Sequence, residues 1–313
     1  MCLRRVDLVK AHNIGAATAR RDGVTFDYHE PTSVREAIEL GARFGGDGRF
    51  LAGGTDLMVQ IHRGRLKPRH VVSLQRVPGL DAIEIDQAVS LGARVTHRRL
   101  EREAGFQGAV RGLVEGAEVV GGHQVRNVAT VGGNIVNASP AADVVVVLLA
   151  LDATLTCLGP AGERRLALDG FTTAPGVTML RPDELLIGTS FPRLAPRSAT
   201  AFLKAGRRRA MEISIACVAA RLTLDASLER CEDVRIALGA VAPTAMRARV
   251  AERHLEGRPL TDGVIREAGR IAAAECRPIG DVRASARYRA LLVASLVPRV
   301  LARCTERIRG GTP

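Results

Sequence analysis

Ala52-Gly53-Gly54-Thr55-Asp56 and Thr130-Val131-Gly132-Gly133-Asn134 are two segments in which a pair of glycines stands close to a threonine and a short polar residue. Adjacent glycines permit positive φ angles and let backbone N–H groups approach a ligand closely. Successive N–H groups in such a turn form a concave nest that suits a phosphate oxygen. One Gly-Gly pair is more often an ordinary turn. Two of them, each after a short apolar run, predict a pyrophosphate held from both sides and therefore a dinucleotide cofactor.

The composition is that of an ordinary globular protein of 313 residues, with 46% apolar and 25% charged residues. The formal net charge of +12 raises nucleic-acid binding as an alternative. Two tyrosines, seven phenylalanines and no tryptophan offer few platforms for stacking bases. The arginines are spread along the chain, and we interpret them as a solvated surface that attracts an anionic cofactor or an acidic partner. We therefore predict no nucleic-acid partner, and the short apolar runs predict no membrane span.

The cysteines and the N-terminus indicate where the protein works. Six cysteines, at positions 2, 157, 217, 231, 276 and 304, form no C-x-x-C pair and have no histidine at the spacing of a zinc site. No metal site is expected, and scattered thiols predict a reducing compartment, the cytoplasm. Residues 1–24 are basic without a continuous apolar stretch, which argues against a secretory signal. We expect them to be a disordered leader.

The opening region has the pattern of a small α/β unit. Phe26–Pro31 is expected to be extended, and Thr32 or Ser33 to cap a helix through Val34–Leu40, with Glu36 completing a capping box. A strand at Phe50–Leu51 leads into the first glycine pair, and a helix begins after it at Leu57. Further strands are expected at 71–74 and 88–92.

The region after the second glycine pair predicts a buried helix. Ser139 and Pro140 have the residue types of a helix start, and Asp143 falls in the first turn. The valines of 144–149 favour a strand by propensity alone, but the Ser-Pro start favours a helix. Two strands should then flank the turn at 159–162. Beyond Pro196 we expect strands at 213–224 and 234–241 and helices at 245–255, 262–275 and 283–303.

Six short segments carry a resemblance to a known family by their order along the chain. They are Phe26–Ser33, Ala52–Leu57, Gln124–Asn134, Pro140 with Asp143, Arg207–Ile213 and Asp281–Arg289. Together they resemble the FAD-binding medium subunit of the molybdenum hydroxylases, the family of xanthine dehydrogenase and aerobic carbon monoxide dehydrogenase. The stretch Leu238–Thr244 also looks like the C-terminal domain of that family. The resemblance covers the chain from about residue 25 to residue 301.

The resemblance implies an α+β fold: a two-part FAD-binding domain of the vanillyl-alcohol oxidase (PCMH) type, followed by a smaller α+β domain. The expected boundaries are 25–80 and 81–195 for the two FAD-binding subdomains and 196–313 for a C-terminal domain of the carbon monoxide dehydrogenase flavoprotein type. FAD would be bound non-covalently, with both glycine segments around its pyrophosphate. The residues expected at the cofactor are Phe50, Ala52, Gly53, Gly54, Thr55, Asp56, Ala129, Thr130, Gly132, Gly133, Asn134, Val136, Asn137, Asp143, Leu186 and Ile213. Asp143 would accept a hydrogen bond from FAD, and Leu186 and Ile213 would border the isoalloxazine.

The same resemblance implies an electron-transfer subunit without a catalytic residue of its own. The expected partners are a small subunit with [2Fe–2S] clusters and a large molybdopterin subunit, in a dimer of heterotrimers. Electrons would pass from the clusters to FAD and then to an external acceptor. The alternative is a self-contained flavoprotein oxidoreductase of the same fold, against which the segment Asp281–Arg289 argues. A nucleic-acid-binding or scaffold protein that has lost FAD is disfavoured by the intact glycines of both pairs.

Overall fold

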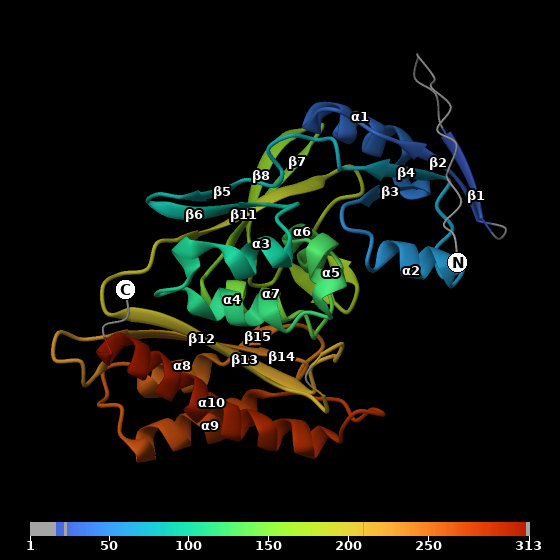
Figure 1. Ribbon diagram of the computed structural model, residues 1–313. Coiled ribbons are helices and arrows are strands. Elements are labelled where there is room, and N and C mark those ends of the chain that lie inside the picture. Colours follow the sequence, from blue (N-terminus) through green and yellow to red (C-terminus); the bar gives the residue numbers. More distant parts are fainter. Residues whose placement is uncertain (1–16, 22–23, 209, 311–313) are drawn as a thin grey trace.

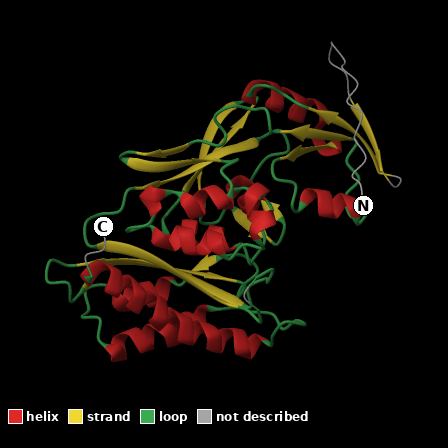
Figure 2. Cartoon of the chain, viewed as in Figure 1, coloured by secondary structure: helices red, strands yellow, loops and turns green. Residues whose placement is uncertain are grey.

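The computed structural model describes residues 17–21, 24–208 and 210–310, and its elements are arranged in layers (Figures 1 and 2). A layer of helices lies between a five-stranded sheet formed by residues 83–192 and a four-stranded sheet of the C-terminal part. A smaller four-stranded unit from the N-terminal region adjoins the five-stranded sheet. No helix within these described ranges is long and apolar enough to cross a bilayer.

The N-terminal unit is a mainly parallel sheet with helices, as the sequence predicts. Its strands lie in the order β1 (Ala17–Arg21), β2 (Val24–His29), β4 (His70–Ser73) and β3 (Gly48–Leu51). Its helices are α1 (Val34–Phe44), the short 3-10 turn η1 (Gly45–Asp47) and α2 (Leu57–His62). Strands β2, β4 and β3 run parallel, whereas β1 pairs antiparallel with β2. Ala17–Arg21, which the sequence places in a disordered leader, instead pair with the open edge of β2 as a strand. Residues 1–16 and 22–23 of that leader lie outside the described residues, so the rest of this expectation stays a prediction.

The start of α1 confirms the predicted cap. The Ser33 hydroxyl accepts a hydrogen bond from the N–H of Glu36 at 3.1 Å. The Glu36 carboxylate reaches back to the N–H of Thr32 at 2.7 Å, one residue earlier than a standard capping box would have it. Both residues thus fix where the chain turns from β2 into α1.

The five-stranded sheet is antiparallel throughout. Its order is β5 (Ile83–Ile85), β6 (Ala88–Gly92), β11 (Leu185–Pro192), β7 (Thr154–Gly159) and β8 (Gly162–Ala167). The helical layer beside it consists of α3 (His97–Arg102), η2 (Ala104–Phe106), α4 (Arg111–Glu118), α5 (His123–Val128), α6 (Val131–Val136) and α7 (Asp143–Ala150). A small hairpin of β9 (Thr172–Ala174) and β10 (Val177–Thr178) completes this part.

Helix α7 is the centre of the main core. All of its residues are buried, so the valine-rich run is a helix, as predicted. Its predicted start is wrong: the helix begins at Asp143 after Ala142, with no side-chain cap. The Ser139 hydroxyl instead accepts from the N–H of Ala141 at 3.3 Å in a local turn before the helix. A side chain so engaged cannot cap a helix that starts several residues later.

The C-terminal part is an antiparallel sheet with helices on one face. The strands lie in the order β12 (Ser198–Ala205), β13 (Ala216–Leu224), β14 (Cys231–Gly239) and β15 (Met246–Arg247). The helices are α8 (Arg249–Leu255), α9 (Asp262–Glu275) and α10 (Ala286–Arg309). Helices α4 and α7 pack against the other face of this sheet (Figure 1). The sequence did not predict β12, whose alanines have low strand propensity and which is fixed by pairing with β13 along its whole length.

Asp152, directly after α7, joins this helix to the C-terminal sheet. Its carboxylate accepts hydrogen bonds from Arg221 at 3.0 Å, Arg235 at 3.0 Å and Arg247 at 2.8 Å. The three arginines come from β13, β14 and β15. A single carboxylate thus fixes the end of α7 over three neighbouring strands.

Candidate functional site

The first glycine segment (Ala52–Asp56) is the loop between β3 and α2, and it packs directly against the chain before the second one (Thr130–Asn134). A β-carbon at Gly53 would lie 2.0 Å from the carbonyl oxygen of Val128, so only glycine fits there. Gly54 has a φ of +73°, which other L-residues rarely adopt. Two segments far apart in the sequence are thereby brought into contact at one place.

The first glycine segment offers hydrogen-bond donors. In the described part of the chain, no oxygen accepts a hydrogen bond from the backbone N–H groups of Gly53–Asp56. All but Asp56 of these residues are half-buried. Backbone donors that lack a protein partner are satisfied by water or by a ligand. The loop thus has the free donors that the predicted nest requires.

The second glycine segment differs from its prediction. Neither Gly132 nor Gly133 has a positive φ, and Val131–Val136 is the helix α6, capped by the Thr130 hydroxyl, which accepts from the N–H of Gly133 at 3.1 Å. The N–H of Gly132 donates to Ala93 at 2.8 Å, and that of Asn134 donates to Thr130 at 2.9 Å. The prediction of a nest of free N–H groups at this segment is therefore wrong, because these N–H groups donate hydrogen bonds to acceptors within α6 and in neighbouring segments.

The glycines of this segment serve close packing and an open surface instead. A β-carbon at Gly132 would lie 2.7 Å from both the β-carbon and the carbonyl oxygen of Ala93. At Gly133 it would meet only the Thr130 hydroxyl, at 3.0 Å, and this residue is exposed. The side-chain oxygen of Asn134 is buried and has no partner in the described chain. An acceptor so placed is open to a donor that the described residues do not provide, from water or from a ligand.

A buried polar cluster supports the second glycine segment from behind. Arg126 of α5 forms an ion pair with Glu101 of α3, and both side chains are almost fully buried. The N–H of His97 donates to the carbonyl oxygen of Ala129 at 3.0 Å. Burial lowers the pKa of His97 to about 4, which keeps its ring neutral at ordinary pH. Arg126 lies in the segment Gln124–Asn134 that carries the family resemblance, but sequence reasoning missed Glu101 and His97, which no local pattern marks.

Asp143 lies at the junction with the C-terminal sheet. One carboxylate oxygen accepts from Lys204 of β12 at 2.7 Å, and the other accepts from the hydroxyl of Ser214 at 2.5 Å. Burial raises the pKa of Asp143, and Lys204 opposes that rise. Lys204 also donates to the carbonyl oxygens of Val119 and Glu212, at 3.1 and 2.8 Å. These contacts give Asp143 a tertiary role, while a hydrogen bond to FAD stays a prediction.

The remaining predicted cofactor residues lie in different surroundings. Leu186 is 3% exposed in the main core, which leaves almost no surface for a ring to contact. Ile213, in contrast, is 52% exposed. The Phe50 ring packs over Gly41 of α1, where a β-carbon would lie 2.5 Å from it. Val136 and Asn137 lie at the end of α6, with Val136 exposed.

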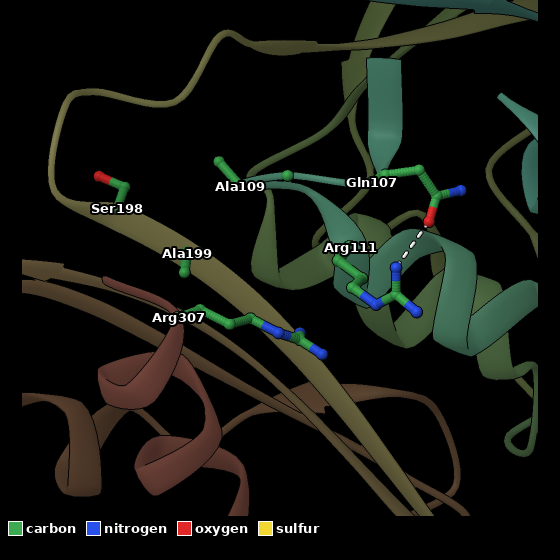
Figure 3. A pocket seen from close by; sticks show the side chains of 7 residues that line it. Gln107, Ala109, Arg111, Ser198, Ala199 and Arg307 are labelled. Carbon is green, nitrogen blue, oxygen red and sulfur yellow. Dashed lines mark hydrogen bonds between the residues drawn. The ribbon is translucent and has the colours of Figure 1, made fainter. Parts of the chain in front are cut away.

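A cavity of about 290 Å³ lies elsewhere, between the loop before α4, the start of β12 and the end of α10 (Figure 3). Its charged groups already have partners. Arg111 donates to Gln107 at 2.6 Å, and Arg307 pairs with Glu115. None of the predicted cofactor residues lines it. The glycine segments therefore remain the candidate site.

Comparison with known proteins identifies relatives over almost the whole chain. Residues 24–194 match the FAD binding domain in molybdopterin dehydrogenase, and residues 201–304 match the CO dehydrogenase flavoprotein C-terminal domain. The carbon monoxide dehydrogenase medium chain of Hydrogenophaga pseudoflava is 31% identical over 284 residues, which is 89% of this chain and 98% of the relative. A putative xanthine dehydrogenase FAD-binding subunit of Escherichia coli K12 is 32% identical, over 88% of this chain and 94% of the relative.

Solved structures agree with these relatives. A carbon monoxide dehydrogenase from Hydrogenophaga pseudoflava that lacks the Mo-pyranopterin moiety superposes with a TM-score of 0.86 at 31% identity, over 90% of this chain and 98% of that one. Quinoline 2-oxidoreductase from Pseudomonas putida 86 superposes with a TM-score of 0.83 at 28% identity, over 90% of this chain and 97% of that one. The chain thus shares its fold with chains of a carbon monoxide dehydrogenase and of quinoline 2-oxidoreductase.

Proposed function

The chain belongs to the family of FAD-binding subunits of molybdenum hydroxylases, and we propose that it carries electrons from a [2Fe–2S] subunit of its complex to an external acceptor. It is a subunit of an oxidoreductase of the carbon monoxide and xanthine dehydrogenase type. FAD belongs to this chain, and molybdenum and iron–sulfur centres belong to other subunits. The described residues hold no group of three or more histidines, cysteines or carboxylates that could bind a metal.

One observation carries the FAD site on which the proposal rests: the free backbone donors of the first glycine segment lie against the chain that leads into the second. The N–H groups of Gly53–Asp56 have no acceptor among the described residues, and Gly53 lies so close to Val128 that only glycine fits. These residues fit a pyrophosphate, which brings several anionic oxygens to one place. The Thr55 hydroxyl is expected to add a further donor, and the buried Asn134 amide a side-chain contact.

FAD supplies, when bound, a centre that takes up electrons singly and releases them as a pair. The residues of this chain bind and orient it, and no proton transfer by a side chain is required of them. Glu101, Arg126 and the Thr130 cap hold the second glycine segment in place beside the first. The main contribution of the protein is therefore a preorganised cradle.

The partners are inferred from the relatives, whose names describe them as medium chains or subunits of dehydrogenases. We expect a small [2Fe–2S] subunit and a large molybdopterin subunit, assembled as a dimer of heterotrimers. The cytoplasmic location stays a prediction from the cysteines. The five described cysteines are free, and burial raises the pKa of Cys157 to about 11.

A titration with cofactor fragments tests the FAD site. The full chain is freed of flavin and titrated with FAD, ADP and riboflavin while flavin fluorescence or heat is recorded. If the backbone donors hold the pyrophosphate, ADP competes with FAD and riboflavin does not. Acid precipitation of the yellow protein should release FAD, with bands near about 370 and 450 nm as for any bound flavin.

The electron path is tested on the complex purified through this chain. Substrate should bleach the flavin band only when iron and molybdenum subunits are present. Flavin that is bleached by substrate in the isolated chain would indicate a self-contained flavoprotein. Riboflavin that competes as well as ADP would show that the glycine segments do not bind the pyrophosphate.

A further inference from the structure

The loop between α9 and α10 presents apolar side chains to solvent although it is tightly held. Val282 is 91% exposed and Ile279 is 70% exposed. Tyr288 and Leu291 follow one turn apart at the start of α10, and both are exposed. The loop protrudes beyond the end of the C-terminal sheet, at the lower right of Figure 1. Contiguous exposed apolar residues of this kind mark interaction surfaces.

Hydrogen bonds fix this loop from within. Asp281 accepts from the N–H groups of Arg283 at 2.8 Å and Ala284 at 3.2 Å, and from the guanidinium of Arg289 at 2.8 Å. Arg289 is buried and also donates to the carbonyl oxygens of Ile215 and Ala240, at 2.6 and 2.9 Å. These bonds hold the pKa of Asp281 well below its usual range. A loop so ordered loses little entropy when it binds a partner.

The apolar surface continues toward the FAD-binding part. Arg207 donates to the carbonyl oxygen of Val282 at 2.5 Å, which joins the loop to the segment that carries Met211 and Ile213. Both of these side chains are exposed. The N–H of Met211 donates to Gly121 at 3.1 Å, directly before α5 and the second glycine segment. The surface therefore runs from the α9–α10 loop to the edge of the cofactor site.

Arginines adjoin these apolar residues along the chain, and all of them are exposed or half-buried. In the described part of the chain they are Arg207, Arg208, Arg277, Arg283 and Arg287. Glu212 pairs with Arg208 and Asp281 pairs with Arg283, which leaves the charges of Arg207, Arg277 and Arg287 in excess. Such a rim attracts acidic groups and repels basic ones. A second copy of this chain would bring the same arginines together. Charge thus favours a partner with an apolar centre and an acidic rim.

On the basis of the function proposed above, we infer that the surface of Met211, Ile279, Val282, Tyr288 and Leu291 is where a subunit of the complex with an apolar centre and an acidic rim docks, with Ile213 left to the cofactor. Docking there covers exposed apolar area beside the chain that leads into the second glycine segment. The partner is then held next to the cofactor without contacting the glycines themselves. FAD binding and partner binding should consequently be separable by mutation.

Two matched pairs of variants test this surface. Val282→Asn removes an apolar contact from the loop, and Val250→Asn makes the same change at an exposed valine of α8. Arg287→Glu reverses a charge of the rim at the start of α10, where an acidic residue suits the helix. Arg299→Glu is its control, exposed farther along the same helix.

Each tagged full chain is purified from cells that make the complex, and iron, molybdenum and FAD per chain are measured. Its affinity for the metal subunits separated from the wild-type complex is then determined at several salt concentrations. Val282→Asn and Arg287→Glu should bind about tenfold more weakly, with FAD content unchanged and both controls like wild type. Salt should weaken wild-type binding and have less effect on Arg287→Glu.

The other outcomes overturn the inference in distinguishable ways. Wild-type affinity in both Val282→Asn and Arg287→Glu places the partner elsewhere. A combined loss of FAD and metal subunits would mean that the loop supports the fold. Loss of a self-dimer with retention of the metal subunits would assign the surface to a second copy. A wild-type chain that carries neither iron nor molybdenum would contradict the proposed function itself.

Discussion

The two glycine segments share a sequence signature and differ in structure. In the first, Gly54 has a left-handed backbone, and no residue that the structure describes accepts a hydrogen bond from the N–H groups of Gly53–Asp56. In the second, Gly132 and Gly133 lie in the first turn of α6, with their donors used by Ala93 and Thr130. A Gly-Gly pair can thus provide donors for a ligand or a close contact between elements. Which of these it provides depends on the neighbours.

The largest effect is expected from Gly53→Ala, which separates the two segments. The added β-carbon would overlap the carbonyl oxygen of Val128, so the loop or α5 must move. We expect a loss of about 3 kcal/mol in the free energy of unfolding and of at least about a hundredfold in FAD affinity. Urea denaturation and FAD titration measure the two. Gly46→Ala, which has nothing within 4 Å, is the control; equal behaviour of both variants would disprove the contact.

The second segment separates packing from binding within one glycine pair. Gly132→Ala should reduce the free energy of unfolding by about 2 kcal/mol, because Ala93 blocks the β-carbon. Gly133→Ala should change it by no more than about 0.5 kcal/mol, since the residue is exposed. If Gly133 faces the cofactor, the same variant should nevertheless weaken FAD binding. Thermal melts with and without FAD check this, and a Gly133→Ala protein with normal FAD affinity would remove Gly133 from the site.

The backbone of the first segment is probed by Gly54→Ala. An alanine at a φ of +73° should cost about 1–2 kcal/mol of the free energy of unfolding. Gly54→Asn should cost less, because asparagine tolerates the left-handed region better. Denaturant midpoints of the three proteins give the order. If alanine and asparagine are equally tolerated, the loop does not depend on a left-handed residue.

The smallest expected effect is a pH dependence of the free energy of unfolding, which arises from the buried His97 beside the second segment. The folded pKa of His97 is about 4, below the usual value of 6.5, so the unfolded chain binds the extra proton between these values. The stabilising contribution is present above pH 6.5 and is lost as the pH falls toward 4. Between pH 7 and 5.5 we expect about 1 kcal/mol less stability. His97→Gln should flatten this part of the profile, and an unchanged slope in the variant would assign it to other groups.

Local patterns were sufficient where neighbours in the sequence decide the structure. The Ser33 cap, the helix at α7, the hairpin of β7 and β8 and the bounds of α9 are as expected. The α+β fold and the FAD-binding family are confirmed, since ordered motifs identify a family even when each motif is weak. The strand β12 and the true start of α7 were not found, because pairing and burial by distant segments determine them.

By itself, the sequence determined that the chain of 313 residues is a flavoprotein subunit, because its two glycine pairs and its ordered motifs identify the family. Only the tertiary structure decided that Gly53 contacts Val128, that the second pair is packed within a helix and that Asp143 is held by Lys204. The physical reason is that these are contacts between residues far apart in the chain. Their energies depend on burial and geometry that residue types and spacings do not contain.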